Sequence, residues 1–260
     1  MSNPKIEKKQ APLAKFLLEG RWAAELSIFS WNFIPLQLAC PKGDGHPVLV
    51  LPGFTAGDWS TKPLRLFLEG LGYKAYGWEQ GTNTGPSAEL MRAMEERLDA
   101  LYQQHGCKVS LVGWSLGGIY ARELARRFPE KVRKVMTLGS PYGAEREHVH
   151  AALIGLLQVL KGKTFEELHA EFLPEGDSPP PVPCTSVYSK TDGVADWTLC
   201  IEDEPDATHQ NIQVYGAHTG LGWNTSIAWL LADRLAQPED DWKKFEPTTR
   251  AERLSYPNIS

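Results

Sequence analysis

The segment that most restricts the fold is a serine flanked by glycines, Gly113-Trp114-Ser115-Leu116-Gly117. An apolar strand is predicted immediately before it, over residues 108–112, and an amphipathic helix immediately after it. The chain must therefore turn sharply with Ser115 at the apex, and the flanking glycines leave room where a Cβ atom would clash. Ser115 then lies beside a helix N-terminus, which favours developing negative charge. Ser115 is the candidate nucleophile; a serine that only caps a packed turn is the alternative.

Strands and helices alternate along most of the chain, and each strand is a nearly continuous apolar run. Such strands are typical of a parallel sheet covered by helices on both faces. We therefore predict an α/β fold with a mostly parallel sheet, in a single domain over residues 1–260. The expected strands are 46–52, 73–78, 108–112, 132–138, 182–188 and 211–215, and the expected helices are 61–71, 86–105, 119–128 and 224–235.

A serine nucleophile needs an adjacent base, and the chain has seven histidines. Catalytic groups in a parallel sheet lie beyond the carboxyl ends of the strands, so the base should follow a strand. His218 follows the strand 211–215 and shares the edge of Ser115, whereas His209 precedes that strand. The remaining histidines precede the first strand, end a helix or lie in an insertion. His218 is the candidate base, with a purely structural hydrogen bond as the alternative.

A third group should orient the imidazole and stabilise its charged form. Asp192 follows the strand 182–188 by a few residues and so belongs to the same edge of the sheet. Asp196, four residues further into the loop, is the rival candidate. An aspartate before glycine is also common in ordinary turns, which is the structural alternative for Asp192.

An acyl-transfer site also needs N–H donors aimed at the tetrahedral oxygen. One should be the backbone N–H of Leu116, directly after the nucleophile. The second should come from the loop after the first strand, where Gly53 lets the backbone fold towards Ser115. The N–H of Phe54 is the candidate and that of Thr55 the alternative.

Four separated segments resemble the α/β-hydrolase superfamily: LPGF at 51–54, GWSLGG at 113–118, KTDGVAD at 190–196 and GAHTGLGWN at 216–224. More narrowly, they are similar to the bacterial lipase and esterase branch, in which a D-G-V loop supplies the acid and an H-x-G-L segment the base. The resemblance spans residues 46–235 and implies a triad in the order Ser115, Asp192, His218, with neither a metal nor an organic cofactor. The serine departs from the aspartate nucleophile of haloalkane dehalogenases and epoxide hydrolases, which argues against those activities.

Residues 142–181 interrupt the alternation of strands and helices with an apolar stripe at helical spacing. We expect a helical lid over the site; a surface helix pair packed on the sheet is the alternative. An apolar underside would favour esters with a hydrophobic acyl or alcohol part. The candidate pocket residues are Trp59, Leu153, Leu156, Leu157 and Trp223.

The loop 82–86 is expected to cap the following helix, with a substrate-facing Asn83 as the alternative. The final stretch, 237–260, is expected to be a peripheral tail that lies along the surface or is disordered. Four cysteines without metal-ligand spacing are expected to be buried free thiols, and a disulfide between Cys184 and Cys200 is left open.

The charge and hydropathy of the sequence argue against several other classes of protein. A net charge of -5 argues against a nucleic-acid-binding face. The longest apolar run, residues 26–40, is too short and too polar for a membrane span. The N-terminal residues lack the pattern of a secretory signal, so a cytoplasmic location is expected.

The expected activity is hydrolysis of a small-molecule carboxylic ester through an acyl-enzyme. The same triad would serve an acyltransferase or a thioesterase, which is the alternative within this class. A non-catalytic binding module that retained the fold is the alternative from a different class. Oligomeric state does not follow from the sequence.

Overall fold

The computed structural model describes residues 18–142, 178–203 and 205–260, and its core is a sheet of six strands in the order β2-β1-β3-β4-β5-β6. Every neighbouring pair is parallel. The strands are β1 (Pro47–Leu51), β2 (Lys74–Gly77), β3 (Val109–Trp114), β4 (Val132–Leu138), β5 (Cys184–Tyr188) and β6 (His209–Gln213). The predicted α/β fold is confirmed, and the strand ends lie within two residues of the predicted ones.

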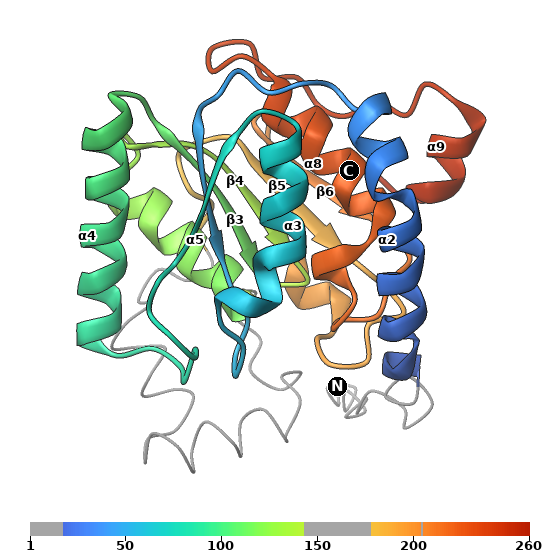
Figure 1. The fold of residues 1–260 in the computed structure, drawn as a ribbon, viewed down its shortest axis with the longest axis horizontal. Helices are drawn as coiled ribbons and strands as arrows, with labels where there is room; N and C mark the ends of the chain where they lie inside the picture. The colour runs from blue at the N-terminus through green and yellow to red at the C-terminus, as the bar shows by residue number, and fades with distance from the viewer. Residues whose placement is uncertain (1–17, 143–177, 204) are drawn as a thin grey trace, which may run out of the picture.

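Helices cover both faces of this sheet (Figure 1). Helices α4 (Ala88–His105) and α5 (Leu116–Arg127) pack on one face, and α3 (Asp58–Gly70) and α8 (Thr225–Ala236) on the other. Successive strand residues alternate between these two cores, so that Leu49 faces α4 and α5 while Val48 and Val50 face α3 and α8. The shorter elements are η1 (Leu18–Arg21), η3 (Trp197–Cys200), η4 (Leu221–Trp223) and α9 (Arg250–Ser255).

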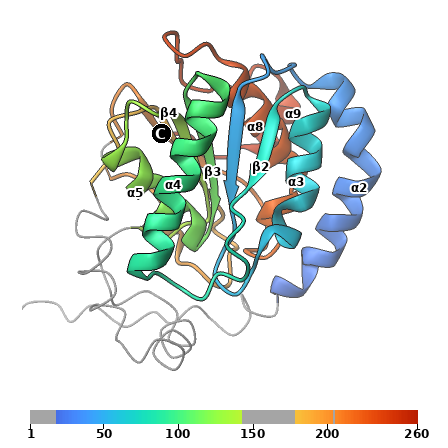
Figure 2. The ribbon, with the colours of Figure 1, turned by 60° about the vertical axis from the view of Figure 1, so that its left-hand side comes forward.

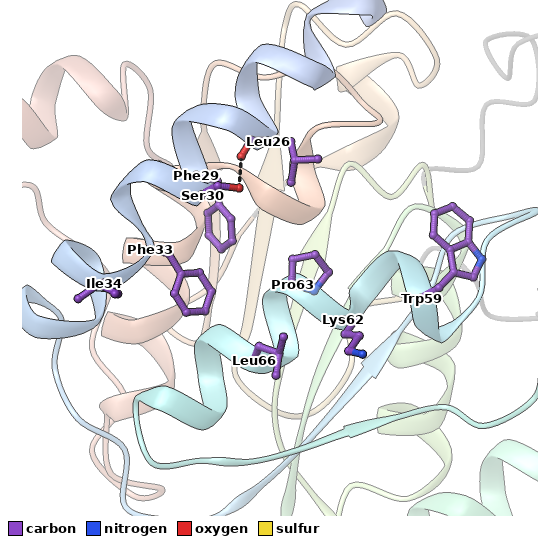
Figure 3. A pocket seen from close by; sticks show the side chains of 9 residues that line it. All are labelled: Leu26, Phe29, Ser30, Phe33, Ile34, Trp59, Lys62, Pro63 and Leu66. Atoms are coloured by element: carbon purple, nitrogen blue, oxygen red, sulfur yellow. Dashed lines mark hydrogen bonds between the residues drawn. The ribbon is translucent and has the colours of Figure 1, made fainter.

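Helix α2 (Trp22–Ala39) forms an additional layer outside α3 and α8 (Figure 2). It was not predicted, because its apolar residues lie on all sides and give no helical period. Phe29 is buried against the core, whereas Trp31 is 85% exposed and Leu38 77% exposed on the opposite side. A shallow apolar groove runs between α2 and α3 (Figure 3). Within the described residues, no helix is both long and apolar enough to cross a membrane.

The C-terminal segment is ordered and lies along the outer edge of β6. Asn211 and Ser260 exchange both backbone hydrogen bonds, with N···O distances of 2.7 and 3.0 Å, and Gln213 donates to the Asn258 carbonyl at 2.8 Å. Phe245 and Tyr256 are buried against the core. These bonds satisfy backbone groups that an open edge strand would leave unpaired.

All four cysteines are free, so the disulfide between Cys184 and Cys200 does not form. Both of these thiols are buried, and burial raises the pKa of Cys184 to about 11. The expectation of buried thiols is wrong for Cys107, which is exposed at the turn between α4 and β3.

A buried ion pair connects α5 to the loop between η3 and β6. Arg122, fully buried in α5, pairs with Glu202, which is 6% exposed. The guanidinium also lies 3.6 Å from the centre of the Tyr142 ring. Because both charges are removed from water, each depends on the other for its stability.

We expect Arg122→Met to lower the free energy of unfolding by about 3–5 kcal/mol, because it leaves the Glu202 carboxylate buried without its partner. Equilibrium unfolding in urea measures this loss. Lys131→Met is the matched control, since its partner Asp99 lies at the surface and exposed pairs contribute little. A loss no larger in Arg122→Met than in the control would contradict the argument.

Candidate active site

Ser115 lies at a sharp turn between β3 and α5, as the glycine pattern predicted. Its φ of 54° and ψ of -123° place a non-glycine residue in a sparsely populated backbone region. A Cβ atom on Gly113 would come within 2.3 Å of the Gly118 Cα, and one on Gly117 within 2.3 Å of the Leu51 carbonyl oxygen. The turn is therefore possible only with glycine at both positions.

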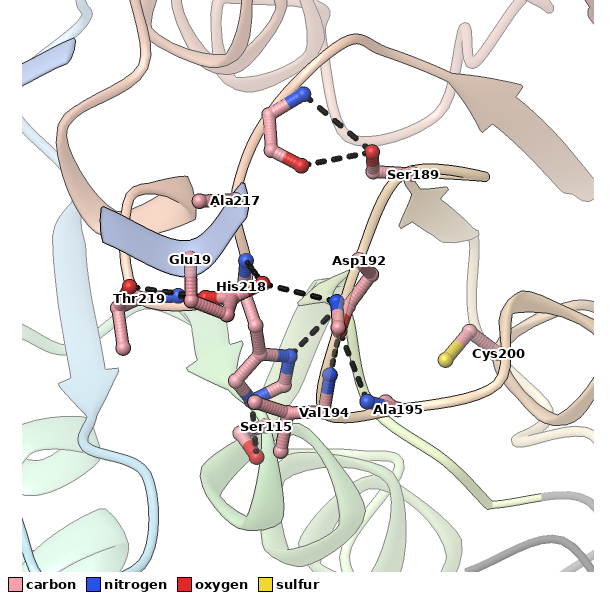
Figure 4. A network of polar contacts seen from close by, with 12 residues as sticks. Glu19, Ser115, Ser189, Asp192, Val194, Ala195, Cys200, Ala217, His218 and Thr219 are labelled. Carbon is pink, nitrogen blue, oxygen red and sulfur yellow. Dashed lines mark hydrogen bonds and ion pairs between the residues drawn. The ribbon is translucent and has the colours of Figure 1, made fainter. Parts of the chain in front are cut away.

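The structure brings Ser115, His218 and Asp192 together in one chain of hydrogen bonds (Figure 4). Nε2 of His218 lies 2.9 Å from Oγ of Ser115, and its Nδ1 lies 2.7 Å from Oδ2 of Asp192. The three residues follow β3, β6 and β5 respectively, so all come from the carboxyl edge of the sheet. All three are buried, which strengthens the electrostatic interactions among them. Their catalytic roles remain predictions.

Asp192, rather than its rival Asp196, contacts the imidazole. The second oxygen of Asp192, Oδ1, accepts from the backbone N–H groups of Val194 and Ala195, each at 2.8 Å. These bonds hold the carboxylate in place with Oδ2 directed at His218. Asp196 instead caps η3, where it accepts from the N–H and the hydroxyl of Thr198.

Burial by itself lowers the pKa of the His218 imidazole, but the charge and hydrogen bond of Asp192, together with the charge of Glu19, raise that pKa above its ordinary value. The imidazolium form is therefore stabilised relative to an isolated histidine. This is the form that His218 would take after it accepts a proton from Ser115.

The candidate oxyanion-hole donors are consistent with this geometry. Among the described residues, no acceptor is found for the N–H of Phe54 or of Leu116. The N–H of Thr55, the alternative donor, is already bonded to the Asn83 carbonyl at 2.8 Å. A Cβ atom on Gly53 would lie 3.2 Å from the Cβ of Ser115, so the loop after β1 passes directly beside the candidate nucleophile.

Asn83 is fully buried and holds that loop in place. Its Nδ2 donates to the Pro52 carbonyl at 3.0 Å, and its Oδ1 accepts from the Tyr120 hydroxyl of α5 at 3.3 Å. The expected cap of the next helix is instead Ser87, which accepts from the Leu90 N–H. Asn83 thus does not cap that helix, and its amide group bonds to other residues of the protein.

The candidate pocket residues have different surroundings. Trp59 is 72% exposed at the start of α3 and lines the groove between α2 and α3 (Figure 3). Trp223 is buried in η4, just after His218 in the chain, and its ring centre lies 5.8 Å from that of Trp114. Leu153, Leu156 and Leu157, with the predicted lid, lie outside the described residues.

A serine at a sharp strand–turn–helix, on a parallel sheet covered by helices on both faces, is typical of the α/β-hydrolase class. Residues 48–255 match the model of the alpha/beta hydrolase family, and the chain belongs to that family. Among the described residues, no cluster of His, Cys, Asp or Glu side chains could hold a metal ion.

A curated relative is the pimeloyl-[acyl-carrier protein] methyl ester esterase of Shewanella woodyi, which is 29% identical over 98 residues. The match covers 38% of this chain and 37% of the relative. Lipase B of Aspergillus fumigatus superposes with a TM-score of 0.56 at 19% identity, over 74% of this chain and 53% of that one. The mature lipase BlEst2 of Bacillus licheniformis superposes with a TM-score of 0.56 at 17% identity, over 76% of this chain and 94% of that one. At these identities the two structures show the shared fold.

We expect Asn83→Ala to lower kcat about tenfold with a smaller change in KM, because the loop carrying the Phe54 N–H loses its anchor to α5. Ester hydrolysis measured over a range of substrate concentrations separates the two constants. Asn32→Ala is the control, since the Asn32 amide only donates to the Ile28 carbonyl on the surface of α2. A folded Asn83→Ala with wild-type kcat would disprove this role.

Proposed function

We propose that this protein is a serine hydrolase that cleaves carboxylic esters through an acyl-enzyme. The observation that carries the proposal is the 2.9 Å contact between Nε2 of His218 and Oγ of Ser115, with Asp192 on the opposite ring nitrogen. A neutral hydroxyl is a poor nucleophile, and an imidazole in this position removes its proton as it attacks.

In the first half-reaction, Oγ of Ser115 attacks the ester carbonyl while Nε2 of His218 takes the hydroxyl proton. Nδ1–H of His218 donates to Asp192 throughout, which fixes the tautomer and stabilises the imidazolium. The N–H groups of Phe54 and Leu116 donate to the negatively charged oxygen of the tetrahedral intermediate. The imidazolium then gives its proton to the leaving alcohol, and the acyl group remains on Ser115.

In the second half-reaction, water replaces the alcohol. His218 accepts a proton from water as it attacks the acyl carbonyl, and then returns that proton to Oγ of Ser115 as the carboxylic acid leaves. The Shewanella woodyi relative is named for cleavage of a methyl ester, and both structurally similar proteins are lipases. These names support an ester with a hydrophobic acyl or alcohol part as the substrate.

Ser115→Ala should reduce the hydrolysis of p-nitrophenyl esters by about four orders of magnitude or more, because neither nucleophile nor acyl-enzyme remains. Labelling by a fluorophosphonate probe should disappear in the same variant. An unchanged circular dichroism spectrum would show that the fold is retained. Wild-type rates in folded Ser115→Ala would refute the proposed function.

The hydrolytic activity should decrease at acid pH, and the midpoint of this acid limb should lie above 6.5, the ordinary pKa of histidine, because the pKa of His218 is raised. His218 must be neutral to accept a proton, so activity falls as the pH drops through this pKa. Asp192→Asn removes the principal charge that raises it, so the limb should move to lower pH and kcat should fall steeply. Asp196→Asn is the matched control and should leave both unchanged; a shift of equal size in the two variants would contradict the assignment.

A further inference from the structure

Glu19, in the turn η1 at the start of the described chain, contacts both loops of the candidate site (Figure 4). Its Oε1 accepts from the backbone N–H of Gly193 at 2.8 Å and from that of His218 at 2.9 Å. Its Oε2 accepts from the N–H of Thr219 at 3.1 Å and from the Thr219 hydroxyl at 2.9 Å. One carboxylate, 8% exposed, therefore joins the residue after Asp192 to His218 itself.

Arg21 and Glu25 extend this contact along the same two loops. The Arg21 guanidinium donates to the carbonyl and the hydroxyl oxygen of Thr191, at 3.1 and 2.7 Å, and pairs with Glu25 at 3.0 Å. Glu25 in turn accepts from the N–H of Ala217 at 2.9 Å. The two loops also bond to each other directly, through Ser189 and Thr191 to the Gly216 backbone and through Asp192 to His218. η1 and the first turn of α2 add bonds to both loops from outside the sheet.

Glu19 also places a negative charge near the imidazole of His218. Burial raises the pKa of its carboxyl group, but the N–H groups of His218, Thr219 and Gly193 lower that pKa below the ordinary value, so the group is ionised. Among the described residues, the charges that act on His218 are those of Asp192 and Glu19. Arg21 and Glu25 are the charged neighbours of Glu19 on its own segment.

We infer that η1 is a positioning clamp for the proposed catalytic centre: Glu19 fixes the acid-bearing loop against the base-bearing loop and adds a second negative charge beside the imidazole, while Arg21 holds the acid-bearing loop through Thr191. Glu19 is a positioning residue, since it touches neither Ser115 nor the reacting atoms. The inference rests on the proposed function and extends it to a segment that precedes the residues matching the family model, 48–255.

Glu19→Gln is the decisive variant, because it removes the charge with little change in size, and its amide oxygen can still accept from Gly193 and His218. We expect the acid limb of kcat/KM to move to lower pH and kcat to fall on the order of tenfold, with KM nearly unchanged. Glu252→Gln is the matched control, since Glu252 also accepts from backbone N–H groups, those of Thr248 and Thr249, but in α9. It should retain the wild-type kcat and pH profile.

A second measurement needs no substrate. The imidazole of His218 is followed by NMR as the pH is varied, with its resonance identified by its absence in His218→Gln. We expect a lower pKa for His218 in Glu19→Gln than in the wild type and no change in Glu252→Gln. An unchanged pKa in folded Glu19→Gln would overturn the inference. Failure of the proposed function is distinct from this result: the wild type would then not hydrolyse esters, while the NMR titration would still report on Glu19.

If Glu19→Gln does not fold, Arg21→Met decides the question, because the Arg21 side chain is 28% exposed and its replacement leaves Glu19 in place. If η1 acts as this clamp, kcat of Arg21→Met should fall several-fold with KM unchanged, since Thr191 loses both of its bonds to the guanidinium. A wild-type kcat in folded Arg21→Met would overturn the inference.

Discussion

The close packing of backbone at the start of α5 determines where every other part of the candidate site must lie. Gly113 and Gly117 let the helix begin against β3 and against the end of β1, at separations that no side chain would permit, and Gly118 does the same against Ser140 after β4. Ser115 is consequently held with a positive φ and its hydroxyl above the sheet. Such a conformation is costly, and it persists because the surrounding strands leave the chain no alternative path. A base for Ser115 has to come from loops at this same edge.

The strand order explains why those loops meet. The chain passes from β1 to β2 on one side of β1 and then to β3 on the other side of β1, so the strand order reverses between β1 and β3. The loop carrying Phe54 lies on one side of this point and Ser115 on the other. Asp192 and His218 arrive from β5 and β6, further along the same edge, and reach Ser115 because their loops extend back over β4. Long loops need support, and Asn83 and Glu19 supply it as buried polar groups with several bonds each.

The features that the sequence predicts are those set by patterns of neighbouring residues, and the features it misses either show no such pattern or depend on contacts between residues far apart in the chain. Most of the buried strands are apolar runs, although β6 (HQNIQ) is largely polar. The position of Ser115, Asp192 and His218 relative to the predicted strands sufficed to place all three at one edge. Helix α2 was missed because a helix that is apolar on both its core and its solvent side has no period to detect. Asn83 and Glu19 were missed for another reason: the partners through which they hold the site loops lie about 30 to 200 residues away in the sequence.

The two ends of the described chain support the same half of the sheet. Ser115 follows a central strand with a hydrogen-bonded neighbour on each side, whereas β6 has only β5 beside it within the sheet. Without further contacts, the loop after an edge strand would be the least constrained part of the site, yet it carries His218, whose ring must stay within hydrogen-bond distance of two partners. Residues 258–260 pair with the free side of β6, and Glu19 binds the loop beyond its carboxyl end. An edge strand can therefore carry the base because segments from outside the sheet restrain both the strand and the loop that follows it.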